Sequence, residues 1–170
     1  MTQTDWIAFL QRLDMLPKGD RISLKRNAGT MLHQADGHTM RVFYQCLPCS
    51  VPQWQEARVF AAACLHCLWD EEERRRQPME QIFCQLGRDQ TVSESTRHRL
   101  EVLLDLPWDE DGFLLAKLTR LIRLGKSRGY AVDCGRLLED LLYWNSEKQI
   151  VQRKWARAVY LTPETISEGG

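Results

Sequence analysis

The sequence lacks long apolar runs and any excess of charge of either sign. No stretch approaches the ~20 apolar residues that a membrane-spanning helix needs, so we expect no membrane association. Residues 1–14 carry an acid and no base ahead of their apolar stretch, so they do not predict a signal peptide. We therefore expect a cytoplasmic protein whose six cysteines are thiols rather than disulfides. Lys plus Arg and Asp plus Glu number 23 each, which excludes binding of nucleic acid by bulk charge.

β-Branched residues are also scarce. Valine and isoleucine together number 14, against 23 leucines, and this ratio favours helices over strands. A chain of 170 residues with 44% hydrophobic and 27% charged residues has ordinary globular composition and can form one domain or two small lobes. Arginine supplies 17 of the 23 basic residues, and its planar fork suits contacts to phosphate or carboxylate.

Apolar residues recur at helical spacing along most of the chain, interrupted by proline and glycine. The pattern predicts an all-α bundle of about eight or nine short helices, with no sheet of three or more strands. The expected starts are Thr4, Asp20, Pro52, Pro78, Ser93, residue 110, Asp133 and Ser146, and residues 38–47 fit either a helix or a strand. The helix from Pro52 is expected to run to the charged residues 70–76, and Gly125 with Gly129 to form a turn. We predict an N-terminal lobe over 1–90, a C-terminal lobe over 91–162 and a flexible tail over 163–170.

Two Cys-x-x-Cys pairs, Cys46 with Cys49 and Cys64 with Cys67, have a spacing near that of zinc ribbons. However, Cys64 falls in register with Ala61 and Leu68 of an amphipathic helix, which is typical of a core thiol. We therefore predict no bound metal and no cofactor, with a small zinc-binding regulator as the alternative.

No residue pattern predicts catalysis. Gly125-Lys126-Ser127 resembles the end of a phosphate-binding loop, but Arg120 stands where that motif needs glycine, and a helix precedes it. The acidic residues at 105 and 109–111 have no calcium-loop spacing. Residues 70–76 (DEEERRR) are expected to pair with one another at i,i+4 on a solvated helix face. The sequence therefore predicts a protein that is not an enzyme.

Three groups of basic residues have no acid within them. They are Lys117, Arg120, Arg123, Lys126 and Arg128; Lys148, Arg153, Lys154 and Arg157; and Arg21, Lys25 and Arg26. Such segregation in a neutral protein indicates a polyanionic partner. The alternative is that these long side chains only surround a helical core.

Several segments together resemble the small subunit of the type I-E CRISPR Cascade, the CasB family, over roughly residues 10–160. They are Leu24-Lys25-Arg26 after Gly19-Asp20, Phe43-Tyr44, Leu86-Gly87-Arg88, and the C-terminal LLEDLLYW and VQRKWARAVY. The sequence departs from the family pattern at Lys25, where arginine is usual, and at Val159, where phenylalanine is common.

The resemblance implies a non-catalytic subunit of a crRNA-guided antiviral DNA-surveillance complex that supports the R-loop. The implied partners are the other Cascade subunits, a second copy of the chain, crRNA, and target DNA, especially its displaced strand. The competing hypothesis is a helical protein–protein adaptor without nucleic-acid binding.

Trp144 and Trp155 are expected to be structural. Arg157 could form an internal ion pair with Glu139 or Asp140 instead of contacting a phosphate. The expected nucleic-acid contacts are Lys25, Arg26, Arg120, Arg123, Lys126, Lys148, Arg153, Lys154 and Arg157.

Overall fold

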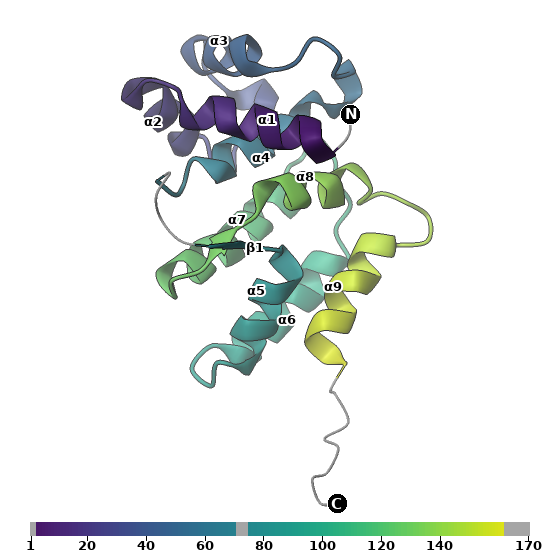
Figure 1. Cartoon of the computed structure of the whole chain (residues 1–170). Helices are drawn as coiled ribbons and strands as arrows, with labels where there is room; N and C mark the ends of the chain where they lie inside the picture. The colour runs from purple at the N-terminus through teal and green to yellow at the C-terminus, as the bar shows by residue number, and fades with distance from the viewer. Residues whose placement is uncertain (1–2, 71–74, 162–170) are drawn as a thin grey trace, which may run out of the picture.

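The computed structural model describes residues 3–70 and 75–161, and these ranges contain nine α-helices (Figure 1). The first four are α1 (Gln3–Asp14), α2 (Lys18–Arg26), α3 (Gly37–Cys46) and α4 (Glu56–His66). The others are α5 (Met79–Arg88), α6 (Ser93–Leu104), α7 (Phe113–Ser127), α8 (Cys134–Leu142) and α9 (Ile150–Tyr160). Two 3-10 turns, Leu32–Gln34 and Gln53–Gln55, lie between them. The predicted all-α fold is confirmed, and no helix in the described ranges is long and apolar enough to cross a membrane.

Two short strands are an addition that the sequence did not predict. β1 (Arg76–Gln77) and β2 (Ala131–Val132) pair in parallel, with Arg76 opposite Ala131. The Arg76 guanidinium also donates to the Val132 carbonyl oxygen at 3.1 Å and lies over the Trp69 ring, 5.6 Å from its centroid. The β1–β2 pair thus holds the segment before α5 against the segment after α7.

Capping residues account for some helix starts and not for others. Asp133 caps α8 as predicted, because its Oδ1 accepts from the Gly135 and Arg136 amides at 3.1 and 3.2 Å. The last helix begins later than predicted. Its N-cap is Gln149, with a left-handed φ of 51°, while the Ser146 hydroxyl accepts from the Ile150 amide at 3.5 Å.

Several sequence predictions need correction. Residues 37–46 form a helix, so the strand alternative is wrong there, and α1 begins at Gln3 rather than at a Thr4 cap. Pro52 leads into a 3-10 turn, and α4 ends at His66, before the charged run. Arg76 lies in a strand and cannot be the helical partner of Glu72, while residues 71–74 of that run lie outside the described ranges. Gly125 is inside α7, so only Gly129 (φ 92°) forms the turn.

The helices pack in two groups (Figure 1). α4 packs against α2 and α8, and α1 against α3 and α8, whereas α5 packs against α6 and α9, and α7 against α6. Contacts therefore cross residue 90 in both groups. The division into lobes at residues 90 and 91 stays a prediction, and the 163–170 tail lies outside the described ranges.

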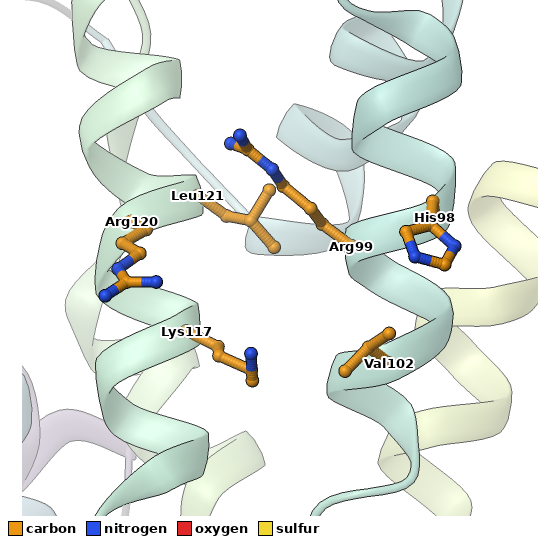
Figure 2. A pocket seen from close by; sticks show the side chains of 6 residues that line it. All are labelled: His98, Arg99, Val102, Lys117, Arg120 and Leu121. Atoms are coloured by element: carbon orange, nitrogen blue, oxygen red, sulfur yellow. The ribbon is translucent and has the colours of Figure 1, made fainter.

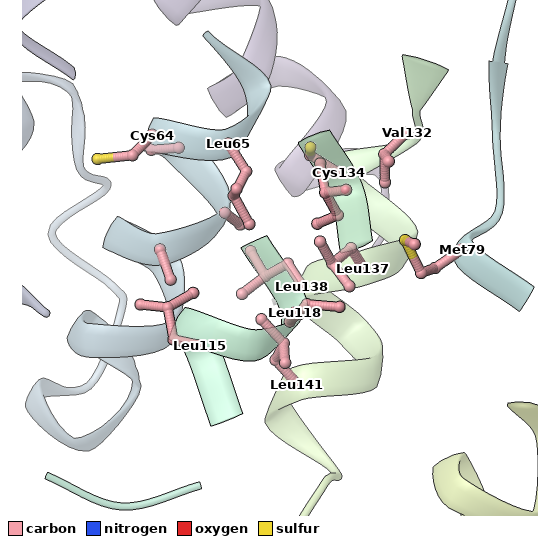
Figure 3. Close-up of a cluster of buried hydrophobic side chains, with 14 of the residues drawn as sticks. Cys64, Leu65, Met79, Leu115, Leu118, Val132, Cys134, Leu137, Leu138 and Leu141 are labelled. Atoms are coloured by element: carbon pink, nitrogen blue, oxygen red, sulfur yellow. The ribbon is translucent and has the colours of Figure 1, made fainter. Parts of the chain in front are cut away.

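The core is built around α4, which is buried along its last two turns. Cys64 lies in this core on a helix, as predicted, with Leu65, Leu115 and Leu138 displayed nearby in Figure 3. Burial raises the pKa of Cys64 well above its ordinary value and that of Cys67 to about 11. Zinc binds thiolates, so this environment disfavours a metal at the second Cys-x-x-Cys pair. The absence of a metal stays a prediction for direct metal analysis.

Trp144 and Trp155 pack against each other where α8 and α9 meet. Their rings meet edge to face, 5.0 Å between centroids, and both side chains are at most 1% exposed. The Trp144 indole donates to the Leu106 carbonyl oxygen at 2.7 Å, and the Trp155 indole donates to Asp140 Oδ2 at 3.0 Å. Both tryptophans are therefore structural, as predicted.

Candidate nucleic-acid interface

A basic groove of about 210 Å³ lies between α6 and α7 (Figure 2). Arg99 and Lys117 extend from the two helices into the space between them, with their charged ends at different levels along the groove. We call this site the α6–α7 groove. Its lining contains three permanent cations, one histidine and two apolar side chains, and no acid: His98, Arg99, Val102, Lys117, Arg120 and Leu121.

Helical periodicity places these cations on one side of the core. On α7, Leu114, Leu118 and Leu121 face inward, so Lys117 and Arg120, three residues apart, lie together at the edge of that stripe. On α6, Leu100 and Leu103 are buried, and Arg99 lies beside them on the side that faces α7. The core leucines thus fix where Lys117 and Arg120 lie relative to Arg99.

The charges of the groove are available for a ligand. Arg99, Lys117 and Arg120 form no hydrogen bond or ion pair with any residue that the structure describes. Arg128, from the same acid-free stretch of sequence, is instead engaged, because its guanidinium contacts Asp89 Oδ2 at 3.0 Å and donates to the Thr91 hydroxyl at 2.8 Å. The groove therefore concentrates uncompensated positive charge beside an apolar wall.

The nine predicted contact residues do not form one surface. Arg120 lines the α6–α7 groove, and Arg123 and Lys126 continue along α7 as exposed side chains. Lys25 and Arg26 end α2, near the opposite end of the molecule from α9, which carries Arg153, Lys154 and Arg157 (Figure 1). Lys148 is exposed in the loop before α9. The predicted set is therefore distributed over three separate regions.

Lys154 differs from its neighbours because it is already paired. Its Nζ lies 2.5 Å from Asp140 Oδ1 and 4.0 Å from Glu80 Oε1. Of the two carboxylates expected as alternative partners of Arg157, Asp140 is bound by Lys154 and the Trp155 indole, and Glu139 has no ion-pair partner among the described residues. Arg157 is exposed and has no ion-pair partner among the described residues. Lys154 is the least available of the nine for a phosphate.

Sequence reasoning left three groove residues out of the predicted set. Lys117 stood in an acid-free run but was not selected, and His98 and Arg99 were passed over. Glu94 and Glu101 are close to Arg99 in the sequence, so the local net charge of that segment is not positive. However, neither glutamate lines the groove. Glu101 lies instead near Tyr160, whose pKa is raised by burial and then by the Glu101 charge. A helical-wheel count of α6 would have separated Arg99 from both acids.

Sequence comparison assigns the chain to a family. The family model described as CRISPR-associated protein Cse2 matches residues 20–160, which is most of the chain. The chain belongs to the Cse2 family. A curated CRISPR-associated protein Cse2 from Thermus thermophilus is 37% identical over 68 residues, which are 40% of this chain. That match spans 37% of the length of the curated relative.

Solved structures share the fold. A crystal structure of a Cse2-family CRISPR-associated protein from Thermus thermophilus is 23% identical, covers 94% of this chain and 98% of that chain, and gives a TM-score of 0.74. CasB from M. ruber is 23% identical over 94% and 92% of the two chains, with a TM-score of 0.71. A chain of a CRISPR RNA-guided surveillance complex is 21% identical over 91% of each chain, with a TM-score of 0.73. The CasB resemblance seen in the sequence is therefore confirmed for family and fold.

Proposed function

We propose that this Cse2-family protein is a non-catalytic subunit of a cytoplasmic, crRNA-guided DNA-surveillance complex. It contacts the nucleic-acid backbone and stabilises the R-loop and the displaced strand. Family membership and the fold shared with a chain of a surveillance complex support the assignment to a complex. The α6–α7 groove is the observation that carries the nucleic-acid role, because it gathers the exposed Arg99 and Arg120 and the half-buried Lys117, and none of the three is paired within the described residues.

The chemistry of the groove suits phosphate rather than bases. Arginine can bind a phosphate with two parallel hydrogen bonds, and Lys117 adds a point charge on the facing helix. Contacts to phosphate position a strand without reading its sequence. Guide–target pairing supplies sequence specificity, and the exchange of duplexes in an R-loop is nearly balanced in free energy. A few backbone contacts to the displaced strand are then enough to favour the open state.

The remaining faces of the protein suit packing within a complex. The chain is neutral overall, although the α6–α7 groove is basic, so other faces carry compensating acids. Such a division lets one side contact crRNA or DNA while another contacts Cascade subunits or a second copy of the chain. The exposed cations of α2 and α9 remain additional candidates for backbone contacts.

The test is target binding by the complex assembled with Arg99→Glu plus Arg120→Glu. We expect normal assembly, weaker target binding and unchanged sequence preference, because only backbone contacts are removed. The matched control reverses two exposed arginines on α1 and α3, Arg12→Glu plus Arg41→Glu, and should bind as the unmodified complex does. Unchanged target affinity in a fully assembled groove variant would instead favour the adaptor function.

A further inference from the structure

The indole of Trp54 is 64% exposed in the 3-10 turn that follows Pro52. It lies at the junction of two grooves. One, of about 560 Å³, also includes Tyr44 and Trp108. The other, of about 790 Å³, extends to the end of α8 and the start of α9. A proline-bounded turn thus presents a large aromatic side chain that the fold itself does not use.

The second groove collects further exposed apolar side chains. Tyr143 is 65% exposed and Ile150 is 58% exposed, and both line it beside the buried Trp6 and Val151. Exposed aromatic and aliphatic side chains that share one concave surface are characteristic of protein interaction sites. We call the two grooves around Trp54 the Trp54 surface.

The charge of the Trp54 surface is opposite to that of the α6–α7 groove. Its cations, Arg58 and Lys154, are both engaged by the fold. Arg58 donates to the Leu141 carbonyl oxygen at 2.8 Å and lies 5.3 Å from the centroid of the Trp108 ring, and Lys154 pairs with Asp140. Against these two cations, the described lining holds five carboxylates: Glu56, Asp109, Glu110, Glu139 and Asp140.

We propose that the Trp54 surface docks a segment of another protein of the complex that presents an arginine or lysine beside an apolar side chain. The cation would stack on the exposed face of Trp54 near Glu110 and Glu139, which have no ion-pair partner among the described residues. The apolar side chain would fill the groove beside Tyr143 and Ile150.

A nucleic-acid strand is disfavoured at the Trp54 surface by the carboxylates. The sequence of residues 162–170 has two glutamates and no Lys or Arg, so its charge does not complement this surface. The inference rests on the proposed function in one respect only, namely that the protein is a subunit of a complex.

Incorporation into the complex tests the docking. Trp54→Ala removes the stacking platform, and we expect its incorporation to fall by about tenfold at limiting concentration, with an unchanged melting temperature. Phe113→Ala is the matched control, because Phe113 is 61% exposed at the start of α7 and lines neither groove. Glu110→Lys plus Glu139→Lys should also lower incorporation, and added salt should weaken incorporation of the unmodified protein. Normal incorporation of all these variants would overturn the proposal.

A photoreactive amino acid at position 54 identifies the occupant in the assembled complex. We expect a crosslink to a different polypeptide, at a segment with Arg or Lys next to an apolar residue, and reversal of that cation should restore binding of the Glu110→Lys plus Glu139→Lys variant. A crosslink to nucleic acid, to a second copy of this chain or to nothing would overturn the proposal. The Arg99→Glu plus Arg120→Glu variant separates the two hypotheses, because it should incorporate normally even if its target binding is also normal.

Discussion

The acid-free basic runs of α7 and α9 look alike in the sequence but differ in the structure. On α7, Lys117 and Arg120 line an open groove together with Arg99 of the neighbouring helix, and no acid lines it. Lys117 extends toward α6, whereas the Arg120 guanidinium lies back along α7 (Figure 2). On α9, Lys154 lies against Asp140 of α8 and near Glu80 of α5, and the adjacent Trp155 is fully buried. The groove-lining cations of the first run are thus available to a ligand, although Arg128 at its end is paired with Asp89. The second run is partly committed to holding helices together.

The difference arises from the helices that face each run. α6 contributes Arg99 and His98 to the lining of the groove beside α7, while α8 contributes a carboxylate with 7% exposure to the α9 side. A buried carboxylate requires hydrogen-bond partners, and Lys154 and Trp155 supply them. A cation in such a run is therefore available to a polyanion only when the helix packed beside it brings no acid into contact with it.

The largest effect should come from the core beneath the α9 run. Trp155→Ala should lower the free energy of unfolding by ~3–5 kcal/mol, because it empties a site enclosed by Phe83 and Trp144. For a chain of this size that corresponds to a fall in melting temperature of roughly 10 °C. Calorimetry checks this against Arg153→Ala, which should stay within ~0.5 kcal/mol of the unmodified protein. Equal melting temperatures for both variants would contradict the structural role of Trp155.

A smaller loss should follow from removing the carboxylate of α8. Asp140→Ala leaves the Trp155 indole N–H buried without its acceptor, which costs about 1–3 kcal/mol. The exposed Glu110 has no ion-pair partner among the described residues, so Glu110→Ala is the control and should be neutral in urea unfolding. If Asp140→Ala proved as stable as the control, the α9 run would not be committed to packing.

A third prediction contrasts a buried titrating group of the core with the exposed groove. His66 Nε2 lies 2.8 Å from Asp14 Oδ1, and Arg21 contacts the same oxygen at 3.1 Å. Burial lowers the pKa of His66, which the Asp14 hydrogen bond only partly offsets. The unfolded state therefore binds a proton at His66 more readily than the folded state does. The stability of the folded state with neutral His66 is fully present above pH ~6.5 and is lost as the pH falls toward the lowered pKa of the folded state.

Urea midpoints from pH 8 to pH 5 measure this dependence. We expect the midpoint of the unmodified protein to fall toward pH 5, and the His66→Gln variant to show a flatter profile. His98 in the groove is the control position, and His98→Gln should retain the slope. A midpoint that rises as the pH falls would reverse the assignment.

The smallest effect on binding should come from Lys154. Lys154→Met removes a charge that Asp140 and Glu80 already compensate, so target binding by the assembled complex should change by less than about twofold. Arg120→Met is the matched substitution on α7 and should weaken binding more. Equal losses from the two variants would remove the distinction between the runs.

Much of this comparison could be predicted from the sequence. Leucine spacing predicts α7, and Asp133 predicts the N-cap of α8. The motifs at Lys25 and near Trp155 indicate the family. The partner of Lys154 could not be predicted, because Asp140 is 14 residues away and meets it only when α8 and α9 pack. Arg99 was missed because its neighbouring acids are close in sequence but project elsewhere on α6. Tertiary packing, not local pattern, decides which charges remain available.

The salt dependence of displaced-strand binding by the assembled complex tests the central claim most directly. Each phosphate contact to a single strand contributes about 0.7 to the slope of log affinity against log salt concentration. Arg99→Gln plus Arg120→Gln should therefore lower the slope by about 1.4, with a smaller change for Arg153→Gln plus Arg157→Gln on α9. An unchanged slope in the groove variant, together with a lowered slope in the α9 variant, would contradict the assignment of the α6–α7 groove as the nucleic-acid interface.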